Sequence, residues 1–549
     1  MRVLFVYPNY ATQLGVSLGL ASLSAVLRRE GHETRLLNLN EALPPVPTEA
    51  DVYAAIHAWE PGLVGFSCLS MQYAEARRLA QGLRARAAAE GRALPPLVVG
   101  GVHPTMVPEA VMADGVWDHV GVGECEDALA RLVAAIARGE RPDDIPNFLS
   151  WRGGARPAAA DAGLIEAEHW RRNPVGEFPD LALLPPPDHE LFATQRILDA
   201  KDGWFSILTS RGCPYRCTYC LNHQVVERYR DDLGRSTAGI GFLRTRPIAG
   251  VMEEIRGILA RFRGVTTFIL DDDLFTLNTA HALAFAEAYR REGFGVPWVV
   301  NSHVRRLAPD LARALAAGGC RIVKLGIESG SERVRREVLL RPMKDDDILA
   351  TIATAEAAGI HTSGFVMLGL PGESAAERMQ TVDFLARSGL GRFRTSLFYP
   401  FPGTDGHRMA VEGGYIDPVA LGEVTDFTRT SALDFGPAEN LAIEKLAACM
   451  PWFVNAAMAA HGEAPAARRY RGPVEAVLAL DRPGWEAFRP RVRELDAALS
   501  TAAAAEGERH YALRYADFLG VRSDWFLAEE AAGRRITASA VPACHVGRR

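Results

Sequence analysis

The feature that most constrains this 549-residue sequence is a loop of three closely spaced cysteines. Cys213, Cys217 and Cys220 have the spacing C-x3-C-x2-C and follow a short apolar run. Gly212 and Pro214 favour a loop at this point, so the three thiolates can face one soft metal centre such as an iron–sulfur cluster. Three protein ligands leave one coordination position open, which is the arrangement of a catalytic metal site.

Two other uses of these cysteines are less well supported. A structural zinc site needs a fourth ligand, and His223 is available for that role. Disulfides are disfavoured because the chain has only eight cysteines and shows no signal peptide. We therefore expect a cytoplasmic protein with reduced thiols.

Composition excludes several classes of protein. Hydrophobic residues make up 48% and charged residues 23%, which predicts a globular chain, and the length predicts two to four domains. Lys plus Arg number 61 against 67 for Asp plus Glu, and the net charge of -6 offers no overall positive field for nucleic acid. No apolar run approaches the roughly 20 residues that span a bilayer. Small or neutral substrates fit this composition better.

Residues 1–145 alternate short apolar runs with helix-length segments, the pattern of a doubly wound, Rossmann-like sheet. Its helical crossovers include residues 18–29 and 73–89. Ligands on such sheets bind in the loops at the carboxyl ends of the strands. The five expected parallel strands are residues 3–6, 34–37, 63–67, 97–99 and 119–122.

Residues 204–425 resume this alternation and predict a partial (β/α)6 barrel of the TIM type, with chemistry at the carboxyl ends of its strands. Polar residues end several strands, which suits a cationic ligand or a ribose, although each could simply cap the next helix. The expected strands are residues 205–209, 267–270, 298–301, 322–325, 362–367 and 395–397, and the polar ends include Asp271, Asp272, Asp273, Asn301, His303, Glu328 and Ser329.

Two segments show no chemical motif. Residues 146–203 are proline-rich with little periodicity and predict a linker. Residues 426–549 predict a mostly helical domain packed on the barrel, with a lid or a substrate pocket as the second interpretation. The predicted fold is therefore α/β, with a doubly wound first domain, a partial barrel and a helical carboxyl-terminal domain.

The cysteine loop, with Tyr219 before its last cysteine, resembles the signature of radical S-adenosylmethionine (SAM) enzymes. The resemblance implies that Cys213, Cys217 and Cys220 hold a 4Fe-4S cluster and that SAM chelates its fourth iron. Residues 364–373 also resemble the family's G-x-I-x-G motif with its L-P-G-E ending. The SAM-binding residues that the resemblance implies are Tyr219, Asp271, Asp272, Asp273, Asn301, Glu328, Ser329, Gly364 and Met367.

The order strand, Ser-x-Leu, strand, Gly-Gly in the first domain resembles a cobalamin-binding domain, and residues 121–126 resemble the G-x-G-E-x-E turn of radical SAM proteins that carry it. The motif D-x-H-x-x-G, whose histidine ligates cobalt in some relatives, is missing. His103 is a weak candidate for that role and is better explained as lining the pocket or capping a loop, with a side chain from residues 69–72 covering the lower face of the corrin. The implied cobalamin contacts are Asn9, Ser67, Leu69, Gln72, Gly100, Gly101, His103, Gly123 and Glu124.

Together these resemblances imply a cobalamin-dependent radical SAM methyltransferase. It would move a methyl group from methylcobalamin to an unactivated carbon of a small molecule or lipid, through a 5'-deoxyadenosyl radical, and would need a low-potential electron donor such as flavodoxin or ferredoxin. Non-methylating chemistry (ring contraction, cyclisation or carbon–carbon coupling) and a non-catalytic cobalamin carrier or sensor stay open as alternatives. The intact cysteines argue against the last. His303 and Tyr399 are candidates for giving hydrogen or a proton to the substrate.

Methylthiotransferase relatives are disfavoured on cysteine count. Those enzymes need three further cysteines in the first domain, and here that domain contains only Cys68 and Cys125. Both are most simply buried small residues.

Overall fold

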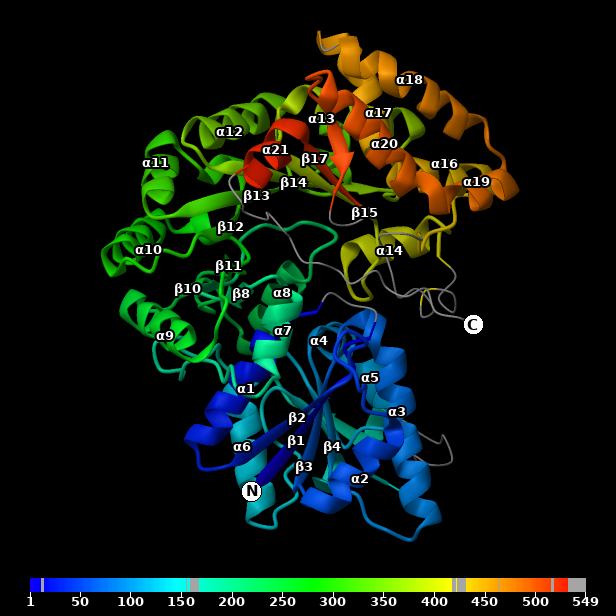
Figure 1. The fold of residues 1–549 in the computed structure, drawn as a ribbon. Helices are drawn as coiled ribbons and strands as arrows, with labels where there is room; N and C mark the ends of the chain where they lie inside the picture. Colours follow the sequence, from blue (N-terminus) through cyan, green and yellow to red (C-terminus); the bar gives the residue numbers. More distant parts are fainter. Residues whose placement is uncertain are drawn as a thin grey trace.

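The computed structural model describes residues 1–10, 14–154, 156–157, 167–416, 421, 431–462, 464–514 and 518–531. One sheet with its helices forms the lower part of the molecule, and a second, larger α/β layer lies above it (Figure 1). The predicted α/β class is confirmed, with a doubly wound first domain, a partial barrel and a helical carboxyl-terminal region. The predicted boundary at residues 425 and 426 lies outside the described residues.

The first sheet has seven strands in the order β2-β1-β3-β4-β5-β6-β7. Its five amino-terminal strands are parallel, as predicted, and β6 and β7 extend it antiparallel. These two strands come from the segment that we expected to be a linker. The bounds are β1 Arg2–Tyr7, β2 Glu33–Asn38, β3 Leu63–Ser67, β4 Leu97–Gly100, β5 His119–Gly121, β6 Phe148–Trp151 and β7 Trp170–Arg172.

Helices cover both faces of this sheet, so it is doubly wound. One face packs against α1 (Leu18–Arg29) and α6 (Glu126–Ala137). The other packs against α2 (Glu49–Trp59), α3 (Ser70–Ala89) and α5 (Pro108–Ala113). The loops at the carboxyl ends of β1, β3 and β4 face the barrel, as Figure 1 shows.

The barrel sheet has eight strands in the order β16-β17-β15-β14-β13-β12-β11-β8. Six are parallel; β17, from the carboxyl-terminal region, pairs antiparallel with β15, and β16 pairs antiparallel with β17. The bounds are β8 Trp204–Ile207, β11 Thr267–Leu270, β12 Trp298–Ser302, β13 Cys320–Glu328, β14 His361–Leu368, β15 Arg392–Leu397, β16 Tyr511–Leu513 and β17 Leu519–Arg522.

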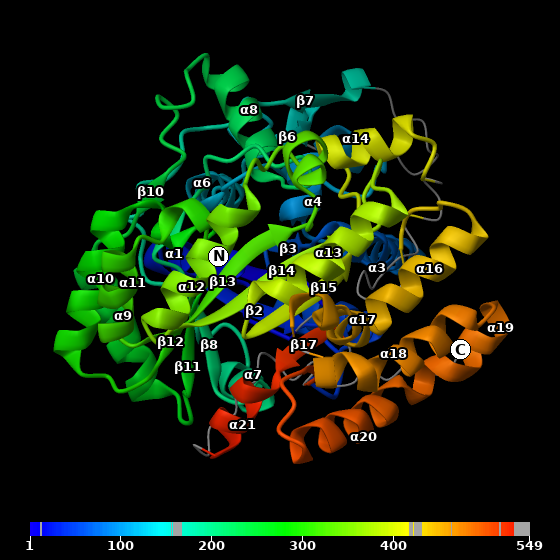
Figure 2. The same ribbon diagram turned by 90° about the horizontal axis from the view of Figure 1, so that it is seen from above.

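Helices on the outside of this sheet bury its outer face, and Figure 2 shows them arranged around the curved strands. They follow the strands in turn, which is the repeated β-α unit of a barrel. The bounds are α9 Ile248–Arg261, α10 Thr279–Glu292, α11 Pro309–Ala317, α12 Asp345–Ala357 and α13 Ala375–Ser388. Two smaller elements frame the cysteine loop: the β9 (Ser210–Arg211) and β10 (Arg244–Thr245) pair, and α8 (Asn222–Leu233).

The carboxyl-terminal region is mostly helical and packs beside α13, chiefly through α17. Its helices include α16 Pro437–Ala448, α17 Met450–Ala457, α18 Ala464–Ala479, α19 Arg482–Phe488, α20 Val492–Ala505 and α21 Ser523–Ala531, whereas α14 (Asp405–Glu412) follows β15 and belongs to the barrel. Within the described residues, no helix has the length and apolarity required to traverse a bilayer.

Candidate functional site

The cysteine loop leaves the carboxyl end of β8 and is held at its start by Asp273. The Gly212 amide donates to Asp273 Oδ2 at 3.1 Å, and Asn222 Nδ2 donates to the other carboxylate oxygen at 3.2 Å. Gly212 has φ of 99°, and a side chain there would collide with the Phe242 carbonyl, so glycine is required. Asp273 therefore joins both ends of the loop to the second barrel strand.

The three thiols suit a cluster better than a single metal ion. Burial raises the pKa of Cys213 to about 11 and of Cys220 to about 12, so these thiols need a bound metal centre to become thiolates. Arg341 Nη1 lies 3.5 Å from Cys217 Sγ and adds positive charge. In the described part of the chain, no three His, Cys, Asp or Glu side chains converge tightly enough to hold one ion. Iron–sulfur clusters are held by cysteine thiolates, and Cys213, Cys217 and Cys220 would supply three of them here.

His223 does not complete a zinc site in this geometry. Its Nε2 atom pairs with Asp405 Oδ2 at 2.9 Å, on helix α14 of the barrel. The imidazole therefore joins α8 to α14, and the sequence-based alternative of zinc loses its fourth ligand.

Tyr219 and Glu328 meet beside the cysteine loop. The Tyr219 hydroxyl donates to Glu328 Oε1 at 3.0 Å, and Arg341 lies near both while donating to the Gly326 carbonyl. Burial raises the pKa of Glu328, and the Arg341 charge opposes this. Glu328 has φ of 70°, a left-handed conformation that costs about 1–3 kcal/mol and clusters at functional sites.

The three consecutive aspartates at the end of β11 separate into different surroundings. Asp272 is fully buried and accepts from the Thr209 amide at 2.7 Å, the Thr209 hydroxyl at 2.6 Å and the Ser210 hydroxyl at 2.5 Å. Asn301 Nδ2 donates to its carbonyl at 2.8 Å. Asp272 and Asn301 therefore fix the strand ends, Asp273 fixes the cysteine loop, and Asp271 faces the barrel interior near Lys324.

The remaining barrel residues in the predicted SAM set lie on β13 and β14. Ser329 is buried and accepts from the Ser331 amide at 3.2 Å. A side chain at Gly364 would meet Ile327 and Leu390, so this glycine permits close packing of β14. Met367 packs in the same apolar cluster that Tyr219 borders.

The two candidates for hydrogen or proton transfer occupy different environments. His303 stacks on Tyr215 of the cysteine loop, with ring centroids 4.2 Å apart, and burial lowers its pKa to about 3. Tyr399 is buried against Phe401 after β15, and burial raises its pKa to about 12. Of these two candidates, His303 is the one whose ring stacks on the cysteine loop.

The glycine pair after β4 presents bare backbone. Gly101 has φ of 101°, and a Cβ atom there would lie 2.7 Å from the Cys68 carbonyl and 3.1 Å from the Ser67 hydroxyl. A Cβ atom on Gly100 would meet nothing within 4 Å, and Leu69 beside this loop is 39% exposed. Open space over bare backbone fits a large planar ligand such as a corrin.

Asn9 and Gln72 join the loops beside this glycine pair, Gly100 and Gly101, which we call the glycine rim. Both are buried, and Gln72 Nε2 donates to Asn9 Oδ1 at 3.1 Å while its Oε1 accepts from the Leu69 amide at 2.9 Å. Asn40 Nδ2 donates to the Asn9 carbonyl at 2.7 Å. The loops after β1, β2 and β3 are thus held as one unit.

His103 is held within the first domain. Its ring stacks on Tyr73 with centroids 4.3 Å apart, and Nδ1 lies 3.1 Å from the Ser70 hydroxyl. Burial lowers its pKa to about 4, so the imidazole is neutral near pH 7. These contacts agree with a side chain that lines or caps the loop.

The turn at Gly123 and Glu124 lies where the first domain meets the cysteine loop. The Gly123 amide donates to the Thr105 hydroxyl at 3.0 Å. Glu124 Oε2 accepts from Arg211 Nη1 at 2.5 Å and from Arg244 Nη1 at 3.1 Å. The sequence analysis assigned Glu124 to cobalamin. It missed Arg211, Arg244 and Arg341, because a single arginine outside a motif cannot be recognised from the sequence.

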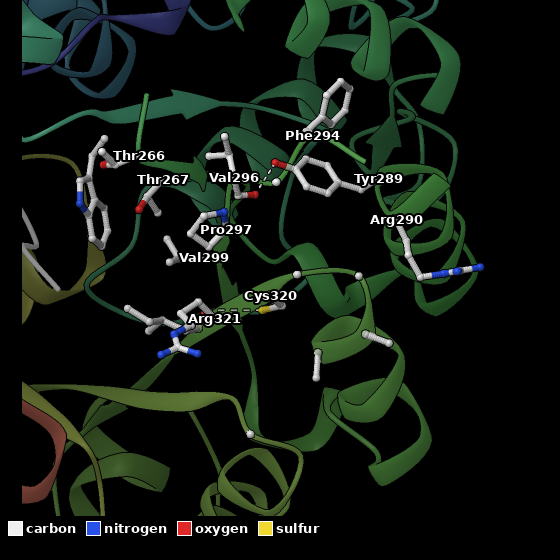
Figure 3. Close-up of a pocket in the computed structure, with 18 of the residues that line it drawn as sticks. Thr266, Thr267, Tyr289, Arg290, Phe294, Val296, Pro297, Val299, Cys320 and Arg321 are labelled. Atoms are coloured by element: carbon white, nitrogen blue, oxygen red, sulfur yellow. Dashed lines mark hydrogen bonds between the residues drawn. The ribbon is translucent and has the colours of Figure 1, made fainter. Parts of the chain in front are cut away.

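A cavity of about 1000 Å³ lies at the opposite end of the barrel. Figure 3 shows side chains from the starts of several strands around it, including Thr267 and Cys320, and the hydrogen bond of 2.6 Å from the Tyr289 hydroxyl to the Val296 carbonyl. Because barrel enzymes place chemistry at the carboxyl ends of the strands, this cavity is not the cofactor site.

The fold, the cysteine loop and the glycine rim together define a class of enzyme. Its barrel has a site for a cluster, and its first domain has a site for a large cofactor. Comparison with known families agrees: the radical SAM superfamily model matches residues 207–385, and the B12 binding domain model matches residues 9–133. The chain belongs to the cobalamin-dependent radical SAM enzymes, whose cofactors are a 4Fe-4S cluster, SAM and cobalamin.

Individual relatives are distant. An uncharacterized methyltransferase of Pyrococcus horikoshii is 26% identical over 74% of this chain and 82% of its own length. A cytidylyl-2-hydroxyethylphosphonate methyltransferase of Streptomyces wedmorensis is 23% identical over 73% of this chain and 79% of its own. The cobalamin-dependent radical SAM enzyme OxsB, solved with aqua-cobalamin and SAM, has a similar fold, with a TM-score of 0.62 at 14% identity over 92% of this chain and 75% of its own.

Proposed function

We propose that this enzyme is a cobalamin-dependent radical SAM methyltransferase that methylates an unactivated carbon of a small molecule or lipid. The observation that carries the proposal is the junction of the two cofactor domains. Arg211, two residues before the first cysteine, pairs with Glu124 at 2.5 Å and with Glu126 at 2.8 Å, both in the first domain. The names of the relatives support methyl transfer as the reaction.

The barrel and the first domain also contact each other beyond β15, which lies at the other end of the parallel barrel strands from β8. Gly403, in the loop after β15, approaches α4 (Val102–Met106) so closely that a Cβ atom there would lie 2.8 Å from the Met106 carbonyl. Helix α4 directly follows the Gly100–Gly101 rim. Close packing on two sides holds reacting groups in place and keeps water out, which radical chemistry requires.

When bound, the cluster with SAM supplies hydrogen-atom abstraction, and cobalamin supplies a transferable methyl group. Cys213, Cys217 and Cys220 would hold the cluster. Arg341 and the Tyr219–Glu328 pair form the polar surroundings beside it. The backbone of the Gly100–Gly101 rim would admit the corrin.

Isotopic labelling tests methyl transfer against other radical chemistry. The anaerobically reconstituted enzyme, with cobalamin, reductant and SAM carrying a CD3 group, is incubated with small-molecule and lipid extracts. We expect a new compound that contains an intact CD3 group. Substrate consumption with an unlabelled product would instead support ring contraction, cyclisation or coupling.

We also propose a small low-potential protein such as flavodoxin or ferredoxin as the electron donor, and the cytoplasm as the location. The net charge of -6 supports the absence of a nucleic-acid partner. Reduction of the cluster by purified flavodoxin and its reductase, followed as loss of visible absorbance under anaerobic conditions, tests the donor. An unchanged spectrum would contradict this choice.

A further inference from the structure

A second cavity, of about 260 Å³, lies on the inner face of the barrel sheet. Alternate residues along a strand face the same side, and the lining follows this rule on β8, β11, β14 and β15. The strand residues in the lining are Trp204, Ser206, Ile269, Lys324, Ser363, Phe365, Arg392 and Arg394, and Asp271 follows β11 directly.

Other parts of the chain complete this cavity. Leu14, Gly15 and Val16, from the loop after β1 in the first domain, line one side. Phe518 and Leu519, at the start of β17, line another, and Lys201 reaches in from the residue after α7 (Thr194–Ala200). The cavity therefore lies where the barrel, the first domain and the carboxyl-terminal strands meet, which is where a substrate could approach both cofactors.

The described lining is cationic. It contains Lys201, Lys324, Arg392 and Arg394 but only one carboxylate, Asp271. Both arginines have partners in the protein: Arg392 Nε donates to Ser363 at 2.9 Å, and the Arg394 guanidinium lies 4.6 Å from the Phe518 ring centroid. The lysines are thus the groups best placed to receive a ligand.

The positive charges of Lys201 and Lys324 are only partly compensated within the protein. Lys324 Nζ lies 3.8 Å from Asp271 Oδ1, and Lys201 is only 6% exposed. Burial lowers the pKa of both lysines, and Asp271 is the group that opposes this for each. Buried charges are stable only when compensated, and one carboxylate shared by two lysines compensates them incompletely.

We propose that Lys201 and Lys324 form an anion subsite inside the barrel, and that the substrate of this enzyme carries an oxyanion, either a carboxylate or a phosphoryl group, which binds there. The inference rests on the proposed function and names its substrate class. Lys324 precedes Glu328 by four residues, about 13 Å along a strand at roughly 3.3 Å per residue. An anion held at Lys324 would therefore anchor one end of a small substrate while the other end extends toward the cysteine loop.

Binding of simple anions to the protein loaded with its cluster and cobalamin, before SAM is added, tests the subsite without turnover. Titration calorimetry with orthophosphate and, separately, with acetate is carried out on the wild type, Lys201→Gln and Lys324→Gln. Lys344→Gln is the matched control, because Lys344 is exposed at the start of α12. We expect saturable binding to the wild type and the control, and at least about tenfold weaker binding to each buried-lysine variant, a difference near 1.4 kcal/mol. The tighter of the two anions identifies the oxyanion class.

Asp271→Asn provides an independent test that does not remove a lysine. Removing the one carboxylate of the described lining should tighten anion binding, and this result supports the subsite even if a lysine variant fails to fold. Equal affinity in all variants would overturn the proposal. So would loss of phosphate binding on saturation with SAM, because the lysines would then hold the carboxylate of SAM.

Formation of 5'-deoxyadenosine, measured on the same samples, separates this inference from the proposed function. Anion binding with the expected variant pattern but no SAM cleavage would support the subsite and count against the proposed function. SAM cleavage with no saturable anion binding would support the proposed function and overturn the subsite.

Discussion

Replacing Glu124 with glutamine perturbs the junction between the first domain and the cysteine loop. The Glu124 and Arg211 side chains are each 21% exposed, and Arg244 is 12% exposed, so water screens these charges only partly. Removing one member of a fully buried pair costs about 3–5 kcal/mol. Arg211 keeps Glu126 at 2.8 Å, and glutamine retains one acceptor, so we expect a smaller loss, about 2–3 kcal/mol in the free energy of unfolding.

Urea unfolding followed by tryptophan fluorescence measures this loss. Glu140→Gln is the control, because Glu140 pairs with Arg138 at the surface, where the side chains are 51% and 60% exposed, and exposed pairs contribute little. We expect Glu124→Gln to unfold at lower urea than the wild type and the control to match the wild type. Equal midpoints for the two variants would refute the reasoning that Glu124 fastens the domains.

Three further outcomes follow from the geometry. Gly101→Ala should weaken cobalamin binding in equilibrium dialysis by about tenfold or more, near 1.4 kcal/mol, because the new Cβ atom would lie 2.7 Å from a carbonyl oxygen. The control Gly91→Ala, at φ of 62° with open space around it, should bind cobalamin like the wild type. Burial lowers the pKa of His103 to about 4, so on acidification the unfolded chain takes up a proton before the folded protein does. The free energy of unfolding should therefore fall as the pH is lowered from about 6.5 to about 4, and it should fall less steeply in His103→Gln. Cys217→Ala should retain less iron than the wild type after anaerobic reconstitution, and equal iron content would contradict its role as a ligand.

Buried parallel strands could be predicted from the sequence. Such strands are continuous apolar runs, and β3 at Leu63–Ser67 and β11 at Thr267–Leu270 have the expected bounds. The antiparallel additions could not be found in this way. Strands β7 and β16 have three residues each, too short for a pattern, and they are defined by their pairing with β6 and β17.

The residues of the candidate site also differ in whether the sequence could predict them. The cysteines carry a local spacing that the sequence shows directly, whereas Arg341 is separated from Cys217 by more than a hundred residues and has no motif. Net charge also gave limited guidance. The overall value of -6 favoured small or neutral substrates, but a whole-chain total cannot reveal that Lys201 and Lys324 meet in one cavity.

The central claim is radical methyl transfer by two cofactors, and its most direct measurement is the pair of SAM-derived products. The enzyme is reconstituted anaerobically with its cluster, cobalamin, SAM and a low-potential reductant, and 5'-deoxyadenosine and S-adenosylhomocysteine are quantified by mass spectrometry. We expect both products from the wild type in the presence of a methyl acceptor, and neither above background from Cys217→Ala. Product levels in the wild type that equal those of Cys217→Ala would contradict the claim.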